Sequence, residues 1–104
     1  MKLITYAAAM TLLLFATDVF AHTPFMACYD NGDTTITCYG EFSDGSIAAA
    51  IPIQVVSNAD KTLLKGVMDE LGEFTFTRPE LPFTVIFDAG AGHIVKEKST
   101  NISE

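Results

Sequence analysis

Positively charged residues are scarce in this sequence. Its 104 residues include six lysines and arginines against thirteen aspartates and glutamates, which gives a net charge of −7 at neutral pH. Nucleic acids and anionic lipid surfaces both attract proteins through clustered positive charge. From this composition we expect that the protein does not bind nucleic acid.

Long apolar stretches are equally rare, since only residues 3–16 form one. This stretch follows Lys2 and leads to the small residue Ala21, which is the pattern of a secretory leader. It is shorter than the ~20 apolar residues of a membrane-spanning helix. We predict a signal peptide over residues 1–21, with a retained N-terminal anchor as the alternative. A single periplasmic or secreted domain over residues 22–104 would remain, with no direct membrane insertion after cleavage.

Cysteine is limited to Cys28 and Cys38, and no Cys-x-x-Cys pair occurs. Two cysteines outside the reducing cytosol usually pair, so we predict a disulfide; a dithiol metal site is the alternative. The residues between them include a strong turn signal, Asp30 to Asp33. Cysteines facing each other across a hairpin would need a loop with an odd number of residues, centred on Asp33. A shorter Asn-Gly turn would instead place Cys28 opposite Thr35.

Alternating apolar and polar residues follow the cysteines in the period-two pattern of half-buried strands. The run over residues 83–87 is apolar at nearly every position, which predicts a central strand covered on both sides. Residues 63–71 include helix formers, but Gly66 in their middle favours a strand. We predict an all-β, antiparallel β-sandwich of about seven strands, with a flexible tail from about residue 97. The expected aromatic core residues are Phe42, Phe74, Phe76, Phe83 and Phe87.

Residues 69–76, Asp-Glu-Leu-Gly-Glu-Phe-Thr-Phe, resemble the hairpin signature of transthyretin-like (prealbumin-like), carboxypeptidase-regulatory-like β-sandwiches. Residues 87–93, Phe-Asp-Ala-Gly-Ala-Gly-His, are similar to a segment of a narrower group. That group consists of small periplasmic accessory components of nickel and cobalt uptake transporters, whose mature chains tend to begin with histidine. The resemblance, over roughly residues 22–95, implies nickel or cobalt as ligand and membrane transporter subunits or another periplasmic protein as partner. This chain lacks the C-terminal membrane helix that such components usually carry, which also allows a free periplasmic protein.

Only two histidines occur, His22 and His93. Cleavage after Ala21 would give His22 a free α-amine, and that amine and the imidazole can chelate one Ni²⁺, Co²⁺ or Cu²⁺ ion. Pro24 has no amide proton, so the backbone cannot supply a third successive nitrogen. We predict His93, on a glycine-rich loop, as the further ligand, with nickel or cobalt favoured and copper second.

Asp88 and Met26 are weaker candidates for the same site. The Asp88 carboxylate either ligates the metal or orients the His93 ring, or else it caps the turn that follows. The Met26 thioether would favour Cu(I), but a methionine at such a position is more often a core residue.

No catalytic motif is present: a Gly-x-Ser-x-Gly elbow is missing and neither cysteine is expected to be a free nucleophile. We therefore predict a protein that is not an enzyme. The alternative to metal binding is a disulfide-linked structural or interaction module that uses a sheet edge or an apolar patch.

Overall fold

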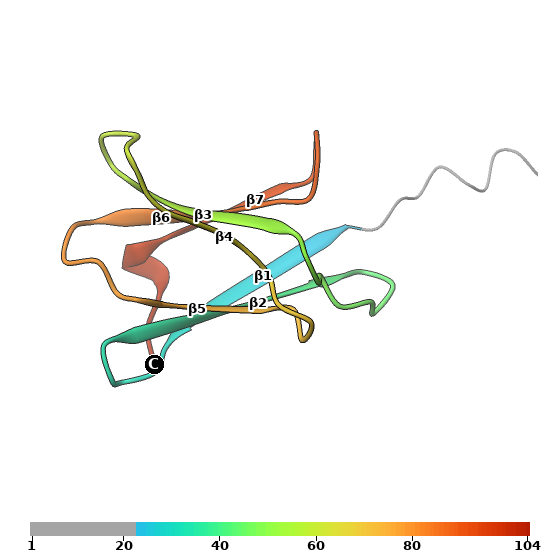
Figure 1. Cartoon of the computed structure of the whole chain (residues 1–104), viewed down its shortest axis with the longest axis horizontal. Helices are drawn as coiled ribbons and strands as arrows, with labels where there is room; N and C mark the ends of the chain where they lie inside the picture. The colour runs from blue at the N-terminus through green and yellow to red at the C-terminus, as the bar shows by residue number, and fades with distance from the viewer. Residues whose placement is uncertain (1–22) are drawn as a thin grey trace, which may run out of the picture.

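The computed structural model describes residues 23–104 and contains seven antiparallel strands there, arranged in two sheets. One sheet has the strand order β1-β2-β5 and the other β4-β3-β6-β7, and Figure 1 shows them as two layers. The predicted antiparallel all-β fold is confirmed, and its arrangement is sandwich-like. The elements are β1 (Pro24–Asp30), β2 (Thr35–Phe42), β3 (Pro52–Ser57), β4 (Thr62–Val67), β5 (Glu73–Thr77), β6 (Phe83–Asp88), β7 (Ile94–Lys98) and the 3₁₀ helix η1 (Ser99–Asn101).

Apolar side chains from both sheets form one core. Ile36 and Cys38 from β2 and Val85 and Phe87 from β6 are all fully buried in it. Gly40 lets the sheets approach closely, because a Cβ at this position would lie 2.7 Å from Cε2 of Phe87. Of the expected aromatic core residues, three are buried and two are half-buried against the core: Phe76, Phe83 and Phe87, then Phe42 and Phe74.

The predicted disulfide is confirmed. Cys28 and Cys38 lie directly opposite each other in the β1–β2 register and are bonded, with their Cα atoms 4.0 Å apart. The hairpin loop closes with a hydrogen bond from the Asn31 N–H to the carbonyl of the first residue of β2, at 2.9 Å. Gly32 and Thr34 in this loop have φ angles of 79° and 74°. The loop with an odd number of residues is therefore the correct alternative, and the shorter turn is not formed.

The segment predicted as a strand over residues 63–71 forms β4 and the turn after it. Gly66 faces the core, where an added Cβ would lie 2.5 Å from Cε1 of Phe74 in the opposite sheet. The strand ends before Asp69, whose carboxylate accepts hydrogen bonds from the N–H groups of Leu71 (2.8 Å) and Glu73 (3.0 Å). A side chain that caps a turn in this way offers the backbone an alternative to the strand ladder.

Strand β6 is central, between β3 and β7, as predicted for the apolar run. Its residues Phe83, Val85 and Phe87 face the core and are buried. Thr84 and Ile86 point to the other side of the sheet, where they are half-buried and no further layer of residues 23–104 covers them. The expectation that both sides of this strand are covered is therefore wrong for the described part of the chain, because a two-layer arrangement leaves one side of each sheet open.

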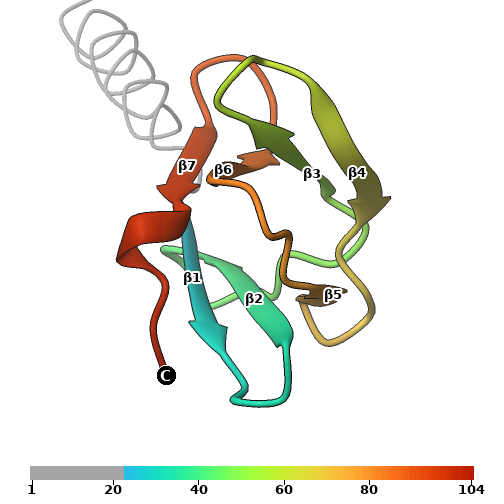
Figure 2. The same ribbon diagram turned by 90° about the vertical axis from the view of Figure 1, so that its left-hand side faces the viewer.

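The C-terminal tail packs against the body, in contrast to the flexible tail expected from about residue 97. Ile102 is 5 % exposed and belongs to the core. The Ser99 hydroxyl accepts a hydrogen bond from the Phe83 N–H at 3.2 Å, and the Asp30 N–H donates to the Ser103 carbonyl at 2.9 Å. Figure 2 shows the tail descending beside β1. The burial of Ile102 and these hydrogen bonds together anchor the tail.

Replacement of Ile102 by alanine is expected to lower the free energy of unfolding by about 2 kcal/mol, because it removes a buried branched side chain. Urea unfolding followed by circular dichroism measures this change. Ile94→Ala is the matched control: Ile94 is 50 % exposed, so its loss should change stability by less than about 0.5 kcal/mol. Equal effects of the two substitutions would show that the tail is not anchored.

Candidate metal centre

The connection between β6 and β7 is a tight turn that presents His93. The Ala89 N–H donates to the His93 carbonyl (3.1 Å), and the His93 N–H donates to the Gly90 carbonyl (2.9 Å). Gly90 and Gly92 have φ angles of 115° and 78°, a region that L side chains rarely adopt. The glycines predicted to shape this loop are thus required by its backbone.

One nitrogen of the His93 imidazole already has a partner. Nδ1 lies 3.2 Å from the Ala91 carbonyl oxygen, and in the tautomer that donates this bond Nε2 carries the lone pair. A metal-ligating histidine commonly donates its other ring N–H to a backbone carbonyl in this way, which fixes the ring. The side chain is half-buried. In that tautomer Nε2 is the ring nitrogen that can accept a hydrogen bond or bind an ion.

Asp88 caps the turn. Its Oδ1 accepts a hydrogen bond from the Gly90 N–H at 3.0 Å, and the residue is exposed at the end of β6. Within residues 23–104, no hydrogen bond joins its carboxylate to the His93 ring. The structure therefore shows Asp88 capping the turn, which is one of the three roles proposed for it from the sequence.

Met26 faces the interior. It lies opposite Gly40 in the β1–β2 register and packs, half-buried, against the core. Its side chain points to the same side of β1 as Cys28, two residues further on. The geometry is that of a core residue.

His22 lies outside the described residues, but the residue after it is firmly placed. The Thr23 N–H donates to the Ser43 hydroxyl at 3.0 Å, and the Thr23 carbonyl accepts from the Ser43 N–H at 2.8 Å. Figure 1 shows the start of β1 and the β6–β7 connection at the same end of the molecule. Strand β1 also contacts β7, the strand that follows His93.

The described residues alone do not assemble a metal centre. Within residues 23–104, no group of three or more His, Cys, Asp or Glu side chains is positioned to hold an ion. Met26 packs against the core and one oxygen of Asp88 is engaged by the turn, so the donor atoms left available at this end are Nε2 of His93 and the second oxygen of Asp88.

At the opposite end of the molecule lies Arg78, which no sequence motif singles out. Its guanidinium forms an ion pair with Asp30 at 2.9 Å and lies 5.8 Å from the centre of the Phe83 ring. It also donates to the Ser99 carbonyl at 3.3 Å. These contacts tie β1, β6 and the tail together, and since the charge of Arg78 is paired, its role is structural.

No helix in the described range is long and apolar enough to cross a membrane. Neither a scan against protein-family models nor searches of the curated proteins and of the solved structures found a match to this chain.

Proposed function

We propose that the protein is exported and binds a divalent transition metal, Ni²⁺ or Co²⁺ first and copper second, as an accessory to metal uptake. The ligands are the α-amine and imidazole of His22 together with His93, on a transthyretin-like sandwich. The observation that carries the proposal is the orientation of His93 on its turn, with Nε2 available, at the end of the molecule where β1 begins.

The chemistry of the chain terminus explains the choice of ligands. An α-amine has an unperturbed pKa of about 7.7–8.0, so a metal can displace its proton near neutral pH. Amine and imidazole nitrogens suit Ni²⁺, Co²⁺ and Cu²⁺. Because Pro24 blocks continued coordination along the backbone, a third nitrogen must come from elsewhere in the fold. His93 is the second of the two histidines in the chain.

Export is supported by two independent features. Residues 2–21 have the pattern of a leader, and the Cys28–Cys38 disulfide fits an oxidising compartment. Cleavage after Ala21 would both release the domain and create the terminal amine. In this proposal the metal is cargo, and the partner is a transporter subunit or another periplasmic protein.

His93→Ala is expected to weaken Ni²⁺ binding about tenfold or more, because the ion loses one nitrogen ligand. The measurement is calorimetric titration of protein that begins at His22, repeated with Co²⁺ and Cu²⁺. Asp88→Asn is the matched control: an amide oxygen can still accept the bond from the Gly90 N–H, and affinity should change by less than about threefold. Unchanged affinity in His93→Ala would refute the proposed site, and a large loss in Asp88→Asn would make Asp88 a ligand.

A further inference from the structure

The outer side of the sheet β4-β3-β6-β7 carries a row of residues aligned by strand register. Lys65 on β4 lies opposite Gln54 on β3, Gln54 opposite Ile86 on β6, and Ile86 opposite Lys96 on β7. Lys98 lies two residues after Lys96, on the same side of β7. We call these five residues the basic face.

The charges of the basic face are not neutralised by the sheet itself. Within residues 23–104, Lys65, Lys96 and Lys98 form no ion pair. Two carboxylates border the face: Asp88, one of whose oxygens accepts the Gly90 N–H, and Asp60 in the β3–β4 turn. Three of the six basic residues of the chain therefore gather, unpaired within this range, on one side of one sheet.

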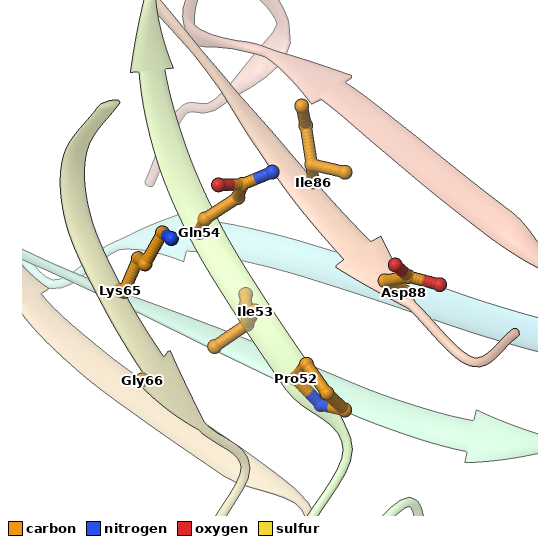
Figure 3. A pocket seen from close by; sticks show the side chains of 7 residues that line it. All are labelled: Pro52, Ile53, Gln54, Lys65, Gly66, Ile86 and Asp88. Carbon is orange, nitrogen blue, oxygen red and sulfur yellow. The ribbon is translucent and has the colours of Figure 1, made fainter. Parts of the chain in front are cut away.

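The face is hollowed on both sides of Gln54 and Ile86. One hollow of about 240 Å³ is lined by Gln54, Lys65, Ile86 and Asp88 among others, and Figure 3 shows these side chains on one side of the sheet. A second, of about 330 Å³, is lined by Ile86, Lys96 and Lys98, by side chains of β3 and β6, and by Asn58 and Asp60 of the β3–β4 turn. Ile86 is common to both, so an apolar side chain lies between two lysine-bordered depressions.

The outer side of the other sheet has the opposite character. It presents Glu41 and Glu73 on either side of Tyr39, and no lysine or arginine lies on β1, β2 or β5. Burial, and then the charges of Glu41 and Glu73, raise the pKa of the Tyr39 hydroxyl. With a net charge of −7 for the whole chain, the basic face is a positive area on an acidic protein.

We propose that the basic face docks an extended, acidic segment of a partner protein, with carboxylates on the lysines and an apolar side chain over Ile86. Alternate residues of an extended chain lie ~6.8 Å apart on one side, which matches the separation of Lys96 and Lys98 along β7. Lys65 and Lys96 are three strand spacings apart, ~14 Å, wide enough for such a segment to lie between them. The inference does not depend on metal binding.

Charge complementarity favours this occupant over a membrane. An anionic bilayer would meet a molecule of net charge −7, and the exposed apolar side chains on this side, Val67 and Ile94, lie apart on the two edge strands β4 and β7. A narrow acidic segment can contact the lysines and Ile86 without meeting the acidic remainder of the surface. The open side of β6, apolar at Ile86, gives that segment a surface to cover.

The test is a titration of the ¹⁵N-labelled protein, with no metal added, with a capped peptide whose alternate residues are glutamate, valine and glutamate, separated by serines, so that the carboxylates and the apolar side chain lie on one side of the extended chain. Chemical-shift changes should be confined to the sheet β4-β3-β6-β7 and should weaken as salt is raised. Lys96→Glu should reduce the affinity for the peptide about tenfold or more. Lys61→Glu, in the β3–β4 turn, changes the net charge equally and should reduce it less than about threefold.

Three outcomes would overturn the inference. Equal losses in Lys96→Glu and Lys61→Glu would mean that the peptide senses net charge alone. Binding to phosphatidylglycerol vesicles that Lys96→Glu abolishes, without peptide binding, would assign the face to a membrane. Self-association that sedimentation detects in the parent protein and not in Lys96→Glu would assign it to the acidic side of a second copy. Urea unfolding of both variants checks that each keeps the fold.

Discussion

A single residue added in front of His22 is expected to lower the affinity for Ni²⁺ about 100-fold or more, equivalent to ~2.7 kcal/mol. The addition converts the α-amine into an amide, which binds no metal unless it loses its proton, and thereby breaks the chelate with the imidazole. No side chain of residues 23–104 is altered. Calorimetric titration of the two forms at the same pH, with Ni²⁺, Co²⁺ and Cu²⁺, measures the difference.

Two comparisons make this result specific. Urea unfolding should be the same for the extended and unextended proteins, since Thr23 and the strands beyond it are unchanged. Combining the extension with His93→Ala should leave no measurable site. Equal affinity of the extended and unextended proteins would eliminate the terminal amine as a ligand, even if His93 still contributed.

Removal of the disulfide in a Cys28→Ala, Cys38→Ala double variant is expected to lower the free energy of unfolding by about 3 kcal/mol. The bond links directly opposed residues across a short hairpin and restricts the unfolded chain. Small domains have a total stability of about 5–15 kcal/mol, so the loss is a large fraction. The melting temperature should fall by about 10 °C or more.

Reductant provides the control for the disulfide prediction. Dithiothreitol should destabilise the parent protein to a similar extent and should leave the double variant unaffected. A parent protein whose urea midpoint does not change on verified reduction would show that the hairpin is fixed by packing alone. In that case the disulfide would be no reason to assign the fold to an oxidising compartment.

The strands and the disulfide could be predicted because they depend on local signals. Alternation placed Phe74 and Phe76 on the inner side of β5, and the turn between Cys28 and Cys38 defined their register. The remaining ambiguity in the hairpin concerned one residue of register. In the structure Thr34 adopts a φ of 74°, and this allows the longer loop to form. A threonine gives no sequence signal for such a conformation.

The tail and the open side of β6 could not be predicted, because both depend on tertiary contacts. Ile102 sits in a polar segment, and only the position of β7 brings it to the core. An apolar run such as residues 83–87 is typical of a strand covered on both sides, yet here the outer side is open within the described range. The apolar composition of a strand shows that its side chains can be buried, but it does not show whether another layer of the protein covers them.

The candidate site could be predicted only in part, because some of its features are local and others depend on tertiary contacts. The glycines and the histidine of residues 89–93 are read directly, and so is the turn-forming tendency of Asp88. The available nitrogen of His93 depends on the contact of its ring with Ala91, which no pattern specifies. The basic face had a signal in the alternation of Lys96 and Lys98, but its third lysine, Lys65, joins it only through the order of the strands.

The most direct test of the proposed function is the identity of the first residue in the exported protein, determined by intact mass and N-terminal sequencing. The account predicts a single species that begins with His22 and carries a free amine. A chain that begins at any other residue, or one whose terminal amine is blocked, would contradict it.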